Sequence, residues 1–182
     1  RWPQGGVEES LWLEKVVKSH RWFAGLQGDE PEALGTLFGE RFAKLHEVRF
    51  ALPVSNGSVA IEIALRALGI RPGDEVIVPA YTFISTATSV LMVGAIPIFA
   101  DMDPGSYCMN AKDVARRVST RTRAIMPVHL GGHMTDMPSL MEVAKKEGIP
   151  VIEDCAQAID SGLEGKKAGK WGDLGTFSFQ SN

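Results

Sequence analysis

The stretch Pro72–Ala100 reads PGDEVIVPAYTFISTATSVLMVGAIPIFA, and it determines the expected fold. Pro72-Gly73-Asp74 predicts a turn. A short β-branched run from Glu75 to Val78 follows, then a helical pattern from Ile84 to Val93, then a second β-branched run from Ile96 to Ala100. A strand, a helix and another strand in this order form a βαβ unit, the building block of a parallel sheet.

The same alternation continues on both sides of this stretch. We expect further strands at Phe50 to Val54, Ala124 to Val128, Pro150 to Glu153 and Thr176 to Phe179, and further helices at Val59 to Leu68, Ala111 to Val118 and Ser139 to Glu147. Runs such as Val76-Ile77-Val78 and Val151-Ile152 are apolar on both faces, which is typical of strands covered on both sides. The sequence therefore predicts the α/β class, with a mostly parallel sheet covered by helices on both faces.

The first part of the chain follows a different pattern. Leu11, Leu13, Val16 and Val17 predict one helix, and apolar residues at helical spacing between Leu34 and Leu45 predict a second one. We expect residues 1–48 to form a helical segment packed on the domain of residues 49–182, because no linker is long enough to separate two domains.

Composition narrows the class of protein. The chain has 182 residues, of which 45% are hydrophobic and 23% charged, as in one globular domain. Its 19 Lys and Arg against 22 Asp and Glu give a net charge of -3, so nucleic acid is not an expected partner. No apolar run approaches the roughly 18 residues of a membrane span, and no membrane partner is expected.

Cys108 and Cys155 are too few for a disulfide framework, so a cytoplasmic location is expected. The sequence begins without Met and ends at Asn182, directly after the apolar run Gly175–Phe179. We expect it to be a piece of a longer chain.

The turn Ser55-Asn56-Gly57-Ser58 follows an expected strand and opens an expected helix. Free backbone N–H groups and the positive end of the helix dipole would meet there, which suits a phosphate group. The alternative is that Ser55 or Asn56 only caps the helix.

Three other candidates also follow strands, at the sheet edge where α/β proteins bind ligands. A carboxylate such as Asp154, in Glu153-Asp154-Cys155-Ala156-Gln157, can hold a cationic ring nitrogen, although it could equally cap the next segment. Tyr81-Thr82-Phe83 offers an aromatic face to a planar ligand, unless Phe83 is simply core. The residues from Ser178 to Asn182 form a polar cluster.

Metal ligation and thiol chemistry are not expected. His129 and His133 lie four residues apart, but Gly131-Gly132 disfavours the helix that would align them. The segment from Asp101 to Pro104 is more simply a turn. Cys155 follows an acidic residue, which raises the pKa of a thiol, so we expect a buried, inert thiol there.

Five segments occur together in a specific order: Ser55–Ser58, Pro72–Pro79 with Tyr81–Phe83, Pro127–Leu130, Glu153–Ala158 and Gly175–Phe179. In this order they resemble the pyridoxal-phosphate-dependent aminotransferases of amino-sugar and antibiotic biosynthesis, the DegT/DnrJ/StrS family. The resemblance covers essentially the whole chain. Arg1-Trp2-Pro3, Trp22 and Gly28-Asp29-Glu30 look most like the branch with aminohydroxybenzoate synthase and the glutamine-dependent inosose aminotransferases.

The resemblance implies an aspartate-aminotransferase-like large domain of fold type I, here residues 49–182, followed by a smaller C-terminal domain that this sequence lacks. It also implies a homodimer that shares its active sites, with pyridoxal 5'-phosphate as the cofactor. By position, Gly57, Ser58, Val59 and Ser178 would bind the phosphate, and Phe83 would stack on the pyridine ring. Asp154 would pair with the ring nitrogen as the catalytic carboxylate, and Gln157 would lie near the ring hydroxyl.

In this family the lysine that forms the Schiff base follows the last matched segment, which places it just after Asn182 and outside this sequence. The implied reaction moves an amino group from L-glutamine or L-glutamate to a keto-sugar or keto-cyclitol. A ketosugar dehydratase, with histidine in place of that lysine, is the main alternative. A non-catalytic member of the family is the other.

Overall fold

The computed structural model describes residues 5–20 and 34–180. The opening Arg1-Trp2-Pro3, Trp22, Gly28-Asp29-Glu30 and Ser181-Asn182, on which parts of the resemblance depend, lie outside the described residues. The described residues before Val54, together with Gln180, form one compact unit, and Val54–Phe179 form a second.

The first unit contains the two helices that the apolar spacing predicts, α1 (Val7–Ser19) and α2 (Leu34–His46). The expected strand from Phe50 to Val54 is wrong, because no strand forms there. Phe50 is 82% exposed and Leu52 is 65% exposed. Pro53 has no N–H to donate to a neighbouring strand. The segment instead packs closely against α2, because a Cβ added to Gly39 would lie only 2.5 Å from the carbonyl oxygen of Ala51.

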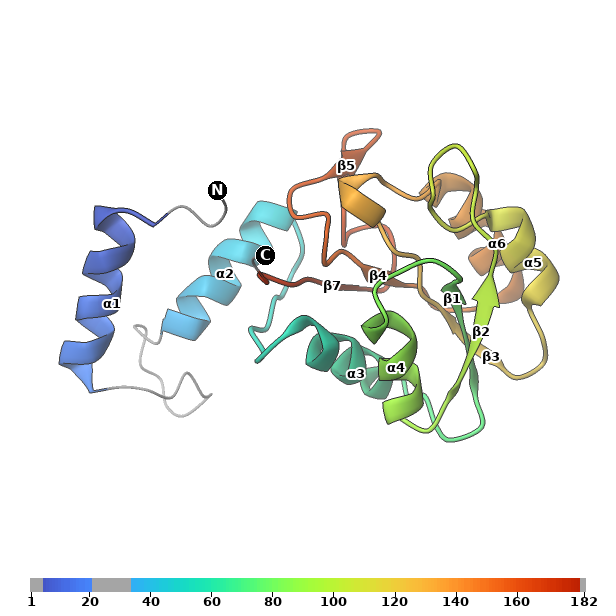
Figure 1. Ribbon diagram of the computed structural model, residues 1–182, viewed down its shortest axis with the longest axis horizontal. Helices are drawn as coiled ribbons and strands as arrows, with labels where there is room; N and C mark the ends of the chain where they lie inside the picture. The colour runs from blue at the N-terminus through green and yellow to red at the C-terminus, as the bar shows by residue number, and fades with distance from the viewer. Residues whose placement is uncertain (1–4, 21–33, 181–182) are drawn as a thin grey trace. The chain divides into compact units, whose positions relative to one another are not determined.

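The second unit has the predicted α/β alternation (Figure 1). Its helices are α3 (Gly57–Ala67), α4 (Ser85–Met92), α5 (Ala111–Arg117), the short 3-10 turn η1 (Leu130–Gly132) and α6 (Met137–Glu147). Its strands are β1 (Glu75–Pro79), β2 (Ile96–Ala100), β3 (Thr122–Ile125), β4 (Ile152–Asp154), β5 (Gly162–Leu163), β6 (Lys166–Lys167) and β7 (Leu174–Thr176).

The main strands run parallel in the order β2-β1-β3-β4-β7. β1 pairs with β2 from Glu75 opposite Ile96 to Pro79 opposite Ala100, and with β3 on its other side. Parallel bridges between Ile125 and Val151 and between Val128 and Asp154 join β3 to β4, which pairs with β7. The strand expected at Thr176 to Phe179 lies earlier in the chain, at Leu174–Thr176. Residues Phe177–Phe179 follow β7 and are not paired in the sheet. Only β5 and β6 pair antiparallel.

The central strand β1 is buried on both faces, as its continuous apolar run predicts, whereas Ile96 and Phe99 of the edge strand β2 are exposed. Along β1, Val76 and Val78 pack into a cluster with Leu65 of α3 and Val90 of α4, whereas Ile77 packs into a second cluster on the other face. That second cluster includes Val114 of α5 and Leu140 of α6. Burying a side chain of this size stabilises a fold by about 1.5–3 kcal/mol, so the two helical layers hold the sheet between them.

Within residues 5–20 and 34–180, no helix is both long enough and apolar enough to cross a membrane.

Candidate active site

Asp154 is the last residue of β4, at the carboxyl end of the parallel sheet. Only 4% of it is exposed. Its Oδ2 accepts a hydrogen bond from Thr86 Oγ1 at 2.9 Å, and its Oδ1 accepts one from the backbone N–H of Ala156 at 3.1 Å. Burial raises the pKa of the Asp154 carboxyl, while the hydrogen bonds from Thr86 and Ala156 oppose that rise. The bond to Ala156 is the kind of local bond that the alternative role of Asp154 as a cap requires. The bond from Thr86 is not local, because Thr86 lies on α4.

The turn before α3 lies next to the end of β7. Asn56 caps the helix, because its Oδ1 accepts from the Val59 N–H at 2.9 Å. That bond engages the N–H of Val59, one of the four residues predicted to bind the phosphate. The N–H groups of Gly57 and Ser58 belong to the first turn, where no helical carbonyl can accept them.

Ser178 reaches the same turn. A Cβ on Gly57 would lie 2.9 Å from the Ser178 Cβ and 3.3 Å from its Oγ, so only glycine fits at this position without displacing Ser178. The structure thus brings together Gly57, Ser58 and Ser178, three of the predicted phosphate-binding residues, from the two ends of the second unit. Two backbone N–H groups and a hydroxyl at a helix N-terminus match the donors that a phosphate accepts.

The aromatic segment between β1 and α4 is not core within the described residues. Phe83 is 61% exposed and Tyr81 is 57% exposed. The alternative in which Phe83 only fills the core is therefore wrong for the described part of the chain. The ring face that stacking on a planar ligand would require remains accessible.

Gln157 lies in the turn that follows β4. Its Oε1 accepts from the backbone N–H of Gly131 at 2.7 Å, which joins this turn to η1. Gly131 has φ 60°, a left-handed conformation that glycine adopts without strain. Because the amide oxygen faces Gly131, the NH₂ group of Gln157 is the end that remains for a donor role.

Glu153 is a structural centre that sequence reasoning missed. It is completely buried beside Asp154. Its Oε1 accepts from the N–H groups of Trp171 at 2.6 Å and Gly172 at 2.7 Å. Its Oε2 accepts from the Gly169 N–H at 3.0 Å and contacts His129 Nε2 at 2.9 Å. One carboxylate therefore holds the loop that leads into β7.

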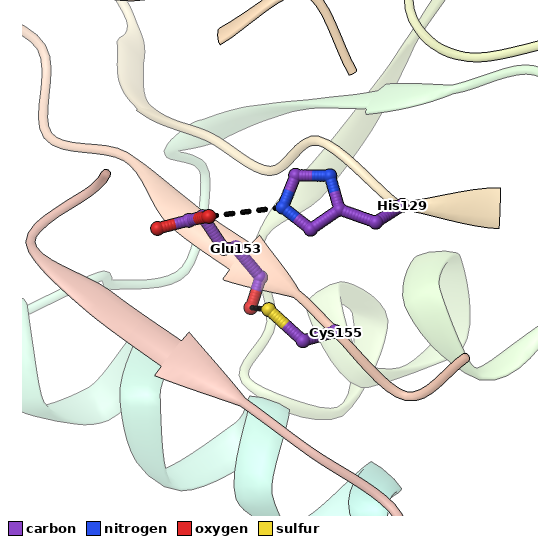
Figure 2. Close-up of side chains that lie close together, drawn as sticks. All are labelled: His129, Glu153 and Cys155. Atoms are coloured by element: carbon purple, nitrogen blue, oxygen red, sulfur yellow. Dashed lines mark hydrogen bonds and ion pairs between the residues drawn. The ribbon is translucent and has the colours of Figure 1, made fainter. Parts of the chain in front are cut away.

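His129 is locked in one tautomer by its two neighbours. The Thr135 N–H donates to Nδ1 at 3.2 Å, so the ring proton lies on Nε2 and is donated to Glu153. Figure 2 shows the imidazole pointing at the Glu153 carboxylate. Cys155 follows two residues after Glu153 in the chain.

His129, Glu153 and Cys155 bring three possible metal-ligand atoms within 4.8 Å of one another. Their hydrogen bonds account for this arrangement, because both ring nitrogens of His129 and both oxygens of Glu153 are already engaged. Burial, followed by the charges of Glu153 and Asp154, raises the pKa of the Cys155 thiol. A neutral thiol is a poor metal ligand. The predicted burial of Cys155 is confirmed.

The acidic turn near Asp101 is explained locally. Asp103 Oδ1 accepts from the N–H groups of Gly105 and Ser106 at 2.9 and 3.0 Å, which is the turn that the sequence predicts.

Comparison with known proteins gives this arrangement a context. The model of the DegT/DnrJ/EryC1/StrS aminotransferase family matches residues 6–182. The chain belongs to this family. The family resemblance inferred from the five sequence segments is therefore confirmed. In this chain, Asp154 and the Gly57–Ser178 contact lie at the carboxyl edge of the sheet.

Several relatives are similar over most of this chain. GDP-perosamine synthase of Escherichia coli O157:H7 is 46% identical over 145 residues, which are 80% of this chain and 40% of that protein. L-glutamine:2-deoxy-scyllo-inosose aminotransferase of Streptomyces kanamyceticus is 39% identical over 181 residues, 100% of this chain and 42% of that protein. The chain spans less than half the length of these curated relatives.

Among solved structures, the crystal structure of 3-amino-5-hydroxybenzoic acid synthase superposes with a TM-score of 0.91 at 38% identity, covering 99% of this chain and 46% of that one. This likeness confirms the fold class, the large domain of fold type I aminotransferases. The expected branch is also confirmed, since this synthase and the inosose aminotransferase are both relatives.

Proposed function

We propose that the protein is a pyridoxal-phosphate-dependent aminotransferase that moves an amino group from L-glutamine or L-glutamate to a keto-sugar or keto-cyclitol. The observation that carries the proposal is the buried Asp154 carboxylate at the sheet edge to which the Gly57–Ser178 contact also belongs. When bound, pyridoxal phosphate supplies an electron-accepting ring that carries the amino group between the two substrates.

The residues present fit such a cofactor. Gly57 and Ser58 would donate their N–H groups to its phosphate and Ser178 its hydroxyl, while Val59 contributes indirectly by holding the Asn56 cap. This set needs no cationic side chain, in keeping with a chain whose net charge is -3.

The remaining residues would bind the ring. An ionised Asp154 keeps a ring nitrogen protonated, which is the state in which the ring accepts electrons best. Phe83 offers its exposed face for stacking, and Gln157 offers its NH₂ group to the ring hydroxyl. We further propose that the working unit is a homodimer with shared active sites and that a smaller C-terminal domain completes the acceptor site.

The experiment is borohydride reduction of the full-length protein after incubation with pyridoxal phosphate, followed by mass spectrometry of the peptide that runs through Asn182. A pyridoxyl adduct on a lysine directly after Asn182 supports transamination. Cofactor binding without that adduct supports the dehydratase alternative, and no cofactor binding contradicts both enzymes.

A substitution tests the role of the carboxylate. Asp154→Ala should nearly abolish amino transfer from L-glutamine, while Glu142→Gln on the exposed face of α6 should leave it unchanged. Equal activity of the Asp154→Ala variant and the unmodified protein would contradict the proposed role of Asp154.

A further inference from the structure

The side chain of Thr86 is the one side chain, within residues 5–20 and 34–180, that hydrogen-bonds to the Asp154 carboxylate. Thr86 lies in the first turn of α4 and is 1% exposed. The other partner of Asp154 is the backbone N–H of Ala156, which any residue except proline would supply at that position. Thr86 is therefore the position through which a substitution can change how this carboxylate is held.

The direction of the hydrogen bonds follows from proton counting. A threonine hydroxyl has one proton, and an ionised carboxylate can only accept, so Thr86 gives its proton to Asp154. Thr86 Oγ1 also lies 2.9 Å from Thr82 Oγ1. Since the proton of Thr86 is already used, Thr82 must donate to Thr86, and the two hydroxyls form a directed relay that ends on Asp154.

The relay begins in the aromatic segment between β1 and α4. Thr82 lies between Tyr81 and Phe83, whose side chains are exposed, and the Thr86 N–H donates to the carbonyl of Phe83 at 3.1 Å. Two bonds therefore tie this segment to Thr86 in the first turn of α4, one through the main chain and one through the hydroxyls. β-branching restricts the χ1 angle of both threonines and helps to keep the relay in place.

We propose that Thr82 and Thr86 are positioning residues, a hydroxyl relay that fixes the orientation and the charge of the Asp154 carboxylate. Its importance for the reaction rests on the proposed function, but its effect on Asp154 does not. Burial of Asp154 opposes its charge, and the Thr86 hydroxyl is the largest of the influences that restore it.

The other groups near Asp154 are held by hydrogen bonds that do not involve Thr86. His129, from the segment after β3, bonds to Asp154 through its main-chain N–H, at 3.1 Å to the Asp154 carbonyl. Glu153 and Cys155 flank Asp154 in the chain, Glu153 is held by its own four donors, and Cys155 is a buried thiol. Loss of the Thr86 hydroxyl should therefore appear directly in the titration of Asp154.

The test is a ¹³C NMR titration of the cofactor-free, full-length protein labelled at aspartate carboxyl carbons, with the Asp154 signal assigned by its loss in Asp154→Asn. Thr86→Val keeps the shape of the side chain and removes the hydroxyl, so the Asp154 titration should move to higher pH. Thr86→Ser keeps the hydroxyl and should restore the original titration. Thr82→Val should cause a smaller shift in the same direction.

Thr88→Val is the matched control, because Thr88 is an exposed threonine on the same helix. It should leave the Asp154 titration unchanged. In parallel, the dissociation constant of pyridoxal phosphate should rise roughly tenfold in Thr86→Val and return toward the original value in Thr86→Ser.

An unshifted Asp154 titration in Thr86→Val, or equal shifts in Thr86→Val and Thr86→Ser, overturns the relay. If Thr86→Val does not fold by circular dichroism, the Thr82→Val titration decides, and no shift there overturns the proposal. If the unmodified protein binds no pyridoxal phosphate, the proposed function fails while the titration still decides the relay.

Discussion

Glu153→Gln tests how much one buried carboxylate contributes to the second unit. Each oxygen of Glu153 accepts two N–H donors, one pair from Trp171 and Gly172 and the other from Gly169 and His129. Glutamine keeps one oxygen and replaces the other by NH₂, which cannot accept. Whichever way the amide turns, two N–H donors that point at the buried side chain lose their acceptor.

The magnitude follows from that count. A buried donor without an acceptor costs roughly 1–3 kcal/mol, and these donors lie at the lower end because they are partly buried, so losing two acceptors should lower the free energy of unfolding by about 2–3 kcal/mol. Since domains are stable by only about 5–15 kcal/mol, the variant should unfold at a much lower urea concentration.

The assay is urea unfolding of the full-length protein, followed by far-UV circular dichroism. Glu142→Gln, which makes the same chemical change at an exposed position on α6, is the control and should change the free energy of unfolding by less than about 0.5 kcal/mol. A loss below about 1 kcal/mol in Glu153→Gln would refute the reasoning, because it would mean that water replaces the lost acceptor.

Three further predictions concern individual contacts. Gly57→Ala should lower stability by about 1–3 kcal/mol and weaken pyridoxal phosphate binding, and Ser178→Gly in the same chain should recover most of the stability, which a double-mutant cycle by urea unfolding measures. Asp113 accepts from the Asp101 N–H, and this bond with Arg116 and Arg117 lowers its pKa from 3.8 to about 2. The ionised Asp113 carboxylate therefore stabilises the folded state by roughly 1–2 kcal/mol above about pH 4, and this contribution is lost as the pH falls toward 2. In Asp113→Asn, the free energy of unfolding should not show this loss between about pH 4 and about pH 2. Gly169→Ala should lower the melting temperature by several degrees, because Gly169 has φ +81° and an added Cβ would lie 2.6 Å from the Phe177 ring, and an unchanged melting temperature would contradict that contact.

The sequence predicted the elements whose signal is local. Ile96–Ala100 forms β2 with the expected bounds, and β1 is buried on both faces as its apolar run implies. Phe50–Val54 has the same kind of composition, but a strand also needs a partner with free donors and acceptors, which composition does not reveal. Phe50 and Leu52 are exposed instead.

The site divides in the same way. Asp154 and Gly57 were found because each follows or opens an element in a recognisable motif. Glu153 was missed because its role depends on main-chain N–H groups of a loop far along the chain, which carry no sequence signal. Thr86 was missed for a related reason: its spacing from Asp154 has meaning only once the sheet has formed.

The contact between Gly57 and Ser178 has a consequence for how the protein is made. The two residues lie near opposite ends of the second unit's sequence, so their contact has a high sequence separation and should form late in folding. During synthesis, Gly57 leaves the ribosome long before Ser178. The phosphate donors at the start of α3 and at Ser178 can therefore come together only after β7 has been synthesised. Affinity for a phosphate ligand would therefore arise only when the chain has been synthesised through Ser178, and it would mark completed folding of the unit.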